Sequence, residues 1–219
     1  MKKFRSPKFN LKYILGEIIL LFVGINLAIW FNNWNNSKTI DKNKTVAIQK
    51  IREEIESNLD ELIEARDQNG RIPDFIEKYD ALSSENGDYI LMSADEMVSF
   101  KEEYSQFYKV IDSTAADHNR FLYKGSTFIH LRMPELSKIA WETSKATGIF
   151  NEFGFDCLYE LESMYNLQGL VEKEINNAFT ALQEESIERL LRILVFIDQL
   201  DKQLEDDYRE MLKSLDNCG

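Results

Sequence analysis

Proline and glycine are scarce in this chain of 219 residues, which contains three prolines and nine glycines. Folds made of many short strands need closely spaced turns, and such turns rely on these two residue types. The chain is rich instead in Leu, Ile, Glu, Lys, Asn and Asp. The composition therefore argues against an all-β sandwich or barrel and predicts an all-α fold made of long helices.

Cysteine is almost as rare, since Cys157 and Cys218 are the two copies. Two cysteines cannot build a disulfide framework, and their spacing does not match that of a metal site. They can form one disulfide if this part of the chain faces an oxidising compartment, or they can remain two free thiols. The sequence leaves both alternatives open.

The sequence also lacks the motifs that carry common chemistries. It has no glycine-rich phosphate loop, no GxSxG, SxxK or CxxC motif, and no Asp-x-Asp-x-Asp-Gly calcium loop. The two histidines, His118 and His130, do not have the spacing of metal ligands. Acidic pairs such as Glu53 and Glu54 are expected to lie on solvated helix faces. We therefore expect no enzymatic activity, no cofactor and no metal ion.

The start of the chain carries a net positive charge, unlike the remainder. The net charge is −12, yet residues 1–36 contain five Lys or Arg against one acid, so residues 37–219 carry −16. Such an acidic segment repels the phosphates of nucleic acids. We therefore expect no nucleic-acid partner.

A long apolar run spans 13–31, where twelve of 19 residues are Ile, Leu, Val or Phe. This is the length that a helix needs to cross a bilayer. Trp30, Phe31 and Trp34 would form an aromatic belt at the far interface, and Tyr13 would lie at the near one. A cleaved signal peptide is the alternative, but bulky residues stand where a small-x-small cleavage site would be. The run is therefore interpreted as an uncleaved transmembrane helix in contact with the lipid bilayer.

The flanking charges predict the orientation of this helix. Five cations and no acid precede it, whereas three lysines and Asp41 follow it within residues 37–44. By the positive-inside rule, residues 1–12 form a basic cytoplasmic tail. The prediction is a protein of the bacterial inner membrane with residues 37–219 in the periplasm.

Two stretches carry a resemblance to a known family. LGEIILLFVGINLAIWFNNWN resembles the anchor of a bacterial family of uncharacterised single-pass membrane proteins, a domain of unknown function that begins with a Gly-Glu-Ile helix ending in Asn-Asn-Trp-Asn. WETSKATG, at 141–148, resembles the Trp-Glu-x-x-Lys-x-x-Gly pattern of the same family. The resemblance implies an architecture and a location over nearly the whole chain. It implies no activity and no catalytic residues.

Polar and small residues within the apolar run predict self-association. At 100° per residue, Glu17, Gly24 and Ala28 lie within about 40° of one another on one helix face. Small residues let helices approach closely, and polar side chains in lipid seek partners, so a homo-oligomer is expected. Asn26 lies on the opposite face and would offer a second contact. Glu17 either reaches back to the basic interface or lines a path for ions, and both alternatives stay open.

Residues 32–68 are predicted to continue the transmembrane helix outward as an interface and stalk helix, although NNWNNS could break it. Asn58 falls at a core position of a heptad pattern. It either sets the register of a coiled coil or packs on another helix of the same chain.

Residues 69–219 are predicted to form a helical domain packed on the stalk, giving an elongated antiparallel helical bundle. Turn residues, first NGRIP at 69–73, and helix-capping signals, such as Ser93 followed by Glu96, separate its helices. The predicted helices cover 74–82, 97–111, 134–148, 156–183 and 184–215. The last has an apolar stripe at helical spacing, namely Leu190, Leu194, Ile197, Leu204, Tyr208, Met211 and Leu215.

Within WETSKATG, Glu142 and Lys145 can pair along one helix face. With Trp141 they form either a surface that docks an unknown protein partner or an ordinary helix with a buried tryptophan.

Overall fold

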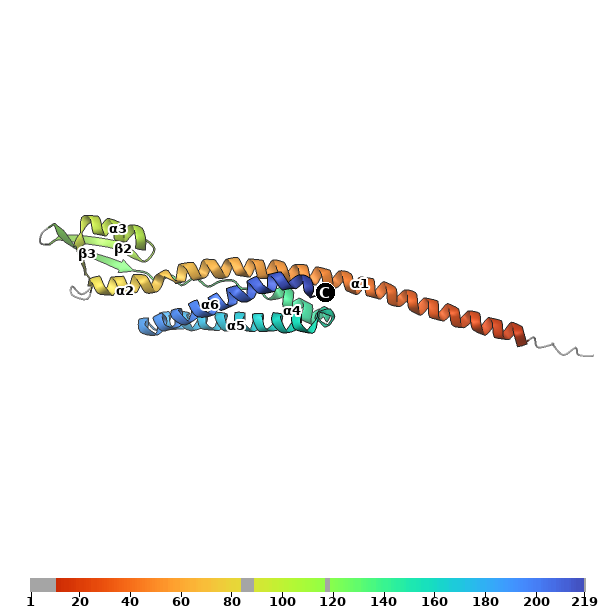
Figure 1. Ribbon diagram of the computed structural model, residues 1–219. Coiled ribbons are helices and arrows are strands. Elements are labelled where there is room, and N and C mark those ends of the chain that lie inside the picture. Colours follow the sequence, from red (N-terminus) through yellow and green to blue (C-terminus); the bar gives the residue numbers. More distant parts are fainter. Residues whose placement is uncertain (1–10, 84–88, 117–118, 219) are drawn as a thin grey trace, which may run out of the picture.

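The computed structural model describes residues 11–83, 89–116 and 119–218. It is an elongated, mainly α-helical molecule with one small sheet, and half of its first helix projects alone from one end (Figure 1). In chain order the elements are α1 (Leu11–Asn69), α2 (Arg71–Ser83), β1 (Tyr89–Ser93), α3 (Ala94–Tyr104), β2 (Tyr108–Ala115), β3 (Arg120–Thr127), α4 (Ile139–Thr147), η1 (Ile149–Glu152), α5 (Phe155–Gln183), α6 (Ile187–Ser214) and η2 (Leu215–Asn217).

Helix α1 is a single uninterrupted helix of 59 residues. At 1.5 Å per residue it is about 89 Å long. The NNWNNS stretch does not break it, and the chain from Ile25 to Asn69 contains neither proline nor glycine. The predicted continuity between the apolar run and the stalk is therefore confirmed, and the helix ends at the predicted NGRIP turn.

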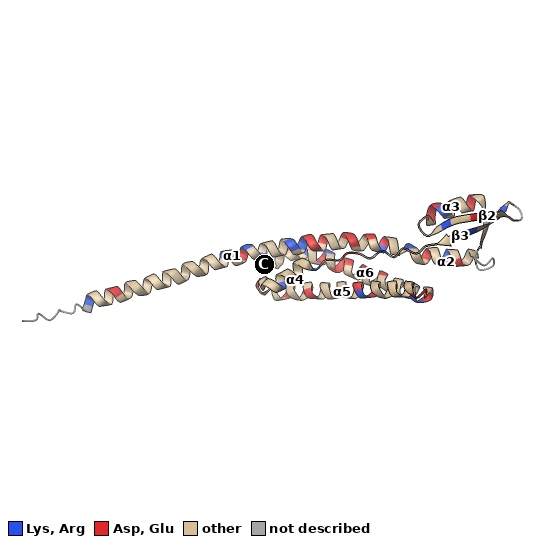
Figure 2. Ribbon diagram, turned by 180° about the vertical axis from the view of Figure 1, so that it is seen from behind, with Lys and Arg blue, Asp and Glu red and all other residues tan. Residues whose placement is uncertain are grey.

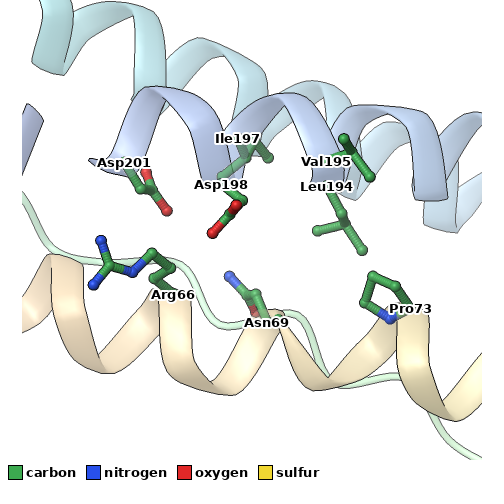
Figure 3. Close-up of a pocket in the computed structure, with 9 residues that line it drawn as sticks. Arg66, Asn69, Pro73, Leu194, Val195, Ile197, Asp198 and Asp201 are labelled. Atoms are coloured by element: carbon green, nitrogen blue, oxygen red, sulfur yellow. The ribbon is translucent and has the colours of Figure 1, made fainter. Parts of the chain in front are cut away.

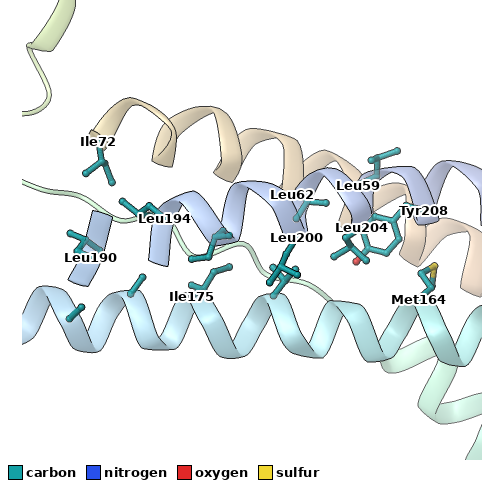
Figure 4. Packing of buried hydrophobic residues seen from close by; sticks show 14 of the residues in the cluster. Leu59, Leu62, Ile72, Met164, Ile175, Leu190, Leu194, Leu200, Leu204 and Tyr208 are labelled. Atoms are coloured by element: carbon teal, nitrogen blue, oxygen red, sulfur yellow. The ribbon is translucent and has the colours of Figure 1, made fainter. Parts of the chain in front are cut away.

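The second half of α1 packs against α5 and α6 in a three-helix arrangement. Helix α6 runs antiparallel to α1, because Arg52 pairs with Asp216 at 2.7 Å and Arg66 pairs with Glu205 at 2.6 Å. The last helix therefore lies antiparallel to the stalk, in agreement with the predicted antiparallel helical bundle. Figure 4 shows the apolar core between the three helices. Every member of the predicted α6 stripe is buried.

A three-stranded antiparallel sheet lies at the end of the molecule opposite the projecting helix, in the order β1-β3-β2. Sequence analysis did not predict it, and the helix expected over 97–111 ends at Tyr104. Phe75 packs α2 against the segment between α3 and β2, since its ring lies 5.1 Å from that of Phe107 and 5.6 Å from that of Tyr104. The chain is thus predominantly all-α, with the small sheet as the exception.

The helix expected to begin at Pro134 begins instead at Ile139. The residues from 128 to 138, which we call the strap, lie along α1 without regular secondary structure. The predicted end of this helix is correct: Gly148 has a φ of 74° and donates its N–H to the carbonyl of Lys145. A left-handed residue of this kind commonly ends a helix, and glycine adopts it at least cost.

Candidate functional site

The projecting half of α1 carries large apolar side chains that are open to the surroundings. Leu20 is 77 % exposed and Phe22 is 69 % exposed. Figure 2 shows that charged residues are sparse here and frequent where α1 packs on the bundle. Among the described residues, one helix is long and apolar enough to cross a membrane, and the apolar part of that helix lies in α1.

Three of the four predicted interface residues form a cluster at the C-terminal end of the apolar run. The rings of Trp30 and Trp34 stack with centroids 6.5 Å apart, and the ring of Phe31 lies 5.9 Å from that of Trp34. The ammonium group of Lys38 lies 4.0 Å from the centroid of the Trp34 ring. Tyr13 is about 31 Å from Trp34 along the helix, close to the ~30 Å thickness of the hydrocarbon core.

The polar residues of the apolar run differ in how their bonding groups are satisfied. Asn26 donates its side-chain N–H to the carbonyl of Phe22 at 2.7 Å, so part of its demand for a partner is met inside the helix. Glu17 is exposed, and nothing approaches the position that a Cβ would take at Gly24. The face of Glu17, Gly24 and Ala28 is therefore the more available of the two predicted contact faces.

Glu54 is buried, which corrects the expectation that it lies on a solvated helix face. Its carboxylate accepts hydrogen bonds from Ser137 Oγ at 2.8 Å, the N–H groups of Ala140 and Trp141 at 2.8 and 3.3 Å, and Tyr165 Oη at 2.7 Å. Two of these donors are free N–H groups of the first turn of α4. A carboxylate from α1 thus caps the N-terminus of α4.

Two asparagines of α1 hold the strap through paired hydrogen bonds. The side chain of Asn58 donates to the carbonyl of Ser137 and accepts from its N–H, both at 2.7 Å. Asn69 makes the same pair with Arg132, both at 2.8 Å. From Asn58 to Asn69 the helix advances eleven residues, or about 16 Å. From Arg132 to Ser137 the strap advances five residues, also about 16 Å if extended, so both asparagines reach their partners. Asn58 therefore packs within its own chain, as one of the two alternatives predicted.

Gln168 of α5 extends this buried polar cluster to α6. It accepts from Tyr208 Oη at 2.9 Å and from the Asn58 amide at 3.3 Å. Burial raises the pKa of both Tyr165 and Tyr208, so both phenols remain donors. The carboxylate of Glu54 raises the pKa of Tyr165 further, whereas at Tyr208 nearby Asn58 opposes the rise and Glu172 adds to it. The side chains of Glu54, Asn58 and Gln168 are hydrogen-bonded to groups of other elements, so the cluster holds α1, α4, α5 and α6 in position.

Trp141 is only 2 % exposed, so the proposed partner surface is wrong for this residue. Its ring stacks on that of Tyr165, with centroids 5.7 Å apart, and the ammonium group of Lys145 lies 5.1 Å from the Trp141 ring centroid. Lys145 also pairs with Glu142 at 2.8 Å. Glu142 and Lys145 remain accessible, whereas the tryptophan belongs to the core.

Cys157 and Cys218 are bonded to each other, which decides between the two alternatives that the sequence left open. Their Cα atoms are 5.3 Å apart, and the bridge closes a loop between positions separated by 61 residues. It ties the end of the chain to the first turn of α5. Disulfides of this kind persist in oxidising compartments.

Asp201 of α6 is a buried acid that sequence analysis did not identify. It is 3 % exposed, and no described residue donates a hydrogen bond to its Oδ1. Burial raises its pKa to about 7; nearby Arg66 opposes this, and Asp198 adds to it. The only signal in the sequence was an acid at a position that continues the apolar stripe, one turn before Leu204.

This pKa predicts that stability falls as the pH rises. The folded chain holds a proton on Asp201 up to about pH 7, while the unfolded chain loses it near the ordinary value of 3.8. Between these values the Asp201 contribution to the free energy of unfolding should fall by about 1.4 kcal/mol per pH unit. The Asp201→Asn variant should lack this slope. Urea unfolding of both proteins at several pH values checks this, and equal slopes would contradict it.

The histidines add no site within the described part of the chain. His118 lies outside the described residues. The ring of His130 stacks on Phe128 with centroids 6.5 Å apart, and the described residues contain no group of three or more His, Cys, Asp or Glu placed to hold a metal. The resemblance to an uncharacterised membrane-protein family stays a prediction. Comparisons with protein-family models, curated proteins and solved structures find no match to this chain.

Proposed function

We propose that this chain is a non-enzymatic, single-pass protein of the bacterial inner membrane that acts as an oligomeric scaffold, sensor or accessory subunit for an unknown protein partner. Its N-terminus would be cytoplasmic and its helical domain periplasmic. The apolar half of α1 and the cations before it support the placement. The disulfide supports an oxidising compartment.

The observation that carries the proposal is the direction in which the domain packs on α1. Val46 is 18 residues after Ala28, about five helical turns, so it lies on the same face. Ile55 is 27 residues after Ala28, about seven and a half turns, so it lies on the opposite face. Val46 is 52 % exposed, whereas Ile55 is fully buried in the core.

The helical domain therefore occupies the side of α1 away from Glu17, Gly24 and Ala28. Copies lying parallel in a membrane can bring these faces together without collision between their domains. The periplasmic parts are strongly acidic and repel one another, so the membrane helix would supply the attraction.

The Gly24→Leu variant is expected to weaken this assembly at least tenfold, because a leucine prevents close approach of the helices. The added side chain meets nothing within its own chain, so the fold should be unaffected. Size-exclusion chromatography with light scattering in detergent measures the change in mass.

Gly16→Leu is the matched control. Gly16 also has free space around it, but it lies about 100° away from the centre of the proposed face. It should leave the oligomer intact. A wild-type chain that is monomeric, or equal effects of the two substitutions, would overturn assembly through this face.

The second candidate function is a small oligomeric membrane pore. It is favoured by the position of the ionisable Glu17 on the same face as Gly24, where assembly would turn it toward neighbouring copies. Ion flux through liposomes that contain the chain should then fall in Glu17→Gln. An oligomer that conducts no ions would remove this candidate and leave the scaffold.

A further inference from the structure

A cavity of about 260 Å³ lies between the α1–α2 junction and α6 (Figure 3). One end is polar and is lined by Arg66, Asp198 and Asp201. The other end is apolar and is lined by Pro73 and Leu194. Ligand sites commonly combine an apolar wall with a few convergent polar groups, and this volume suits a ligand smaller than a drug-sized molecule.

Asp201 presents an oxygen without a protein partner at the polar end. The residue is 3 % exposed, and no described group donates to Oδ1. Buried polar groups are nearly always paired, and a buried acceptor without a donor is costly to keep. We therefore expect a hydrogen-bond donor from outside the chain to bind this oxygen.

The cations near the cavity lie within ion-pair distance of carboxylates, although Arg66 Nη1, like Asp201 Oδ1, makes no hydrogen bond to a described residue. Arg66 lies 2.6 Å from Glu205 Oε2, and Lys202 lies 2.6 Å from Asp198 Oδ2. Asp201 is one turn after Asp198 on the same helix, and Figure 3 shows both lining the α6 wall of the cavity. A second carboxylate on this wall favours a positively charged donor over a neutral or negative one.

We propose that this cavity binds a compact organic ammonium ion, a primary amine with a short apolar chain. The ammonium group would donate to Asp201 Oδ1, and the apolar chain would lie against Pro73 and Leu194. An anionic ligand would face two carboxylates, while the positive charge of Arg66 is already paired with the carboxylate of Glu205.

Such a ligand would contact α6 and the α1–α2 junction together. Its binding would therefore stabilise the packing of α6 on α1 at the end of the bundle away from the apolar run. The inference rests on the sensor role within the proposed function and names the ligand class that would be sensed. The site is independent of the membrane helix, however, and Gly24→Leu should leave binding unchanged. Failure of assembly and failure of binding are thus separate results.

The test uses the full chain in detergent with n-butylammonium chloride as the probe. Isothermal titration and thermal unfolding at about pH 8, above the pKa of Asp201 at about 7, should show saturable binding and a raised melting temperature. Affinity should fall at least tenfold in Asp201→Asn, and also at about pH 6, where protonation removes the charge. Asp206→Asn, an exposed acid of the same helix, is the matched control and should bind as the wild type does.

Sodium butyrate and butanol serve as comparison ligands of similar size, and sodium chloride controls for ionic strength. Neither comparison ligand should match the amine. Butanol binding as tightly as the amine would overturn the requirement for a cation. Absence of saturable amine binding, or equal affinity in wild type and Asp201→Asn, would overturn the site.

Discussion

Replacing Glu54 with alanine is expected to lower the free energy of unfolding by about 4 kcal/mol, because it breaks a buried charged network. The change removes the acceptor for two N–H groups at the start of α4 and for the hydroxyls of Ser137 and Tyr165. Tyr165 and Trp141 are buried, whereas Ser137 and Ala140 are half-buried, so water compensates these donors only in part.

Urea unfolding of the full chain in detergent, followed by far-UV circular dichroism, measures the change. Glu53→Ala is the control, since Glu53 is exposed and its hydrogen bonds to described residues stay within its own helix, with Lys50 and Gln49. We expect no measurable loss there. Equal effects of the two substitutions would contradict the proposed contribution of the Glu54 hydrogen bonds to stability.

Removing the disulfide by Cys157→Ser with Cys218→Ser is expected to cost about 4 kcal/mol of stability. A bridge that closes a loop of roughly this length restricts the unfolded chain by about that amount in the loop-entropy account. For a domain of this size the melting temperature should fall by roughly 10 °C. Thermal unfolding of the double variant and of the wild type checks the size of the loss.

Reduction of the wild type offers an independent control for this prediction. Dithiothreitol should lower the melting temperature of the wild type to that of the double variant and leave the double variant unchanged. A wild type insensitive to reductant after full unfolding and refolding in its presence would contradict the bond. Mass spectrometry of alkylated protein reports the redox state directly in each sample.

The elements that the sequence predicted well are those whose signals are local. The spacing of apolar residues defines the core face of α6, and Gly148 marks the end of α4. The capping-box pair of Ser93 and Glu96 marks the start of α3, where both reciprocal hydrogen bonds form. Each of these depends on neighbours within a few turns, so periodicity and capping chemistry suffice.

The predictions that failed depend on partners far away in the chain. Glu54 resembles its neighbour Glu53 in sequence, yet its donors come from residues more than 80 positions later. Pro134 resembles the start of a helix, but the strap is held extended by Asn58 and Asn69. Strand β2 is mostly exposed and β3 is half-exposed, and neither has a regular apolar alternation, so no local pattern predicted them.

The sequence by itself determined that this chain is mainly helical, that it contains an apolar helix able to span a membrane, and that its remainder is strongly acidic. These are properties of composition and periodicity. Only the tertiary structure decided which polar residues are buried, that the two cysteines meet, and that the domain packs on the side of α1 away from Gly24 and Ala28. Such features depend on long-range packing, because burial and pairing are set by the segments that fold against a residue and not by its neighbours in sequence.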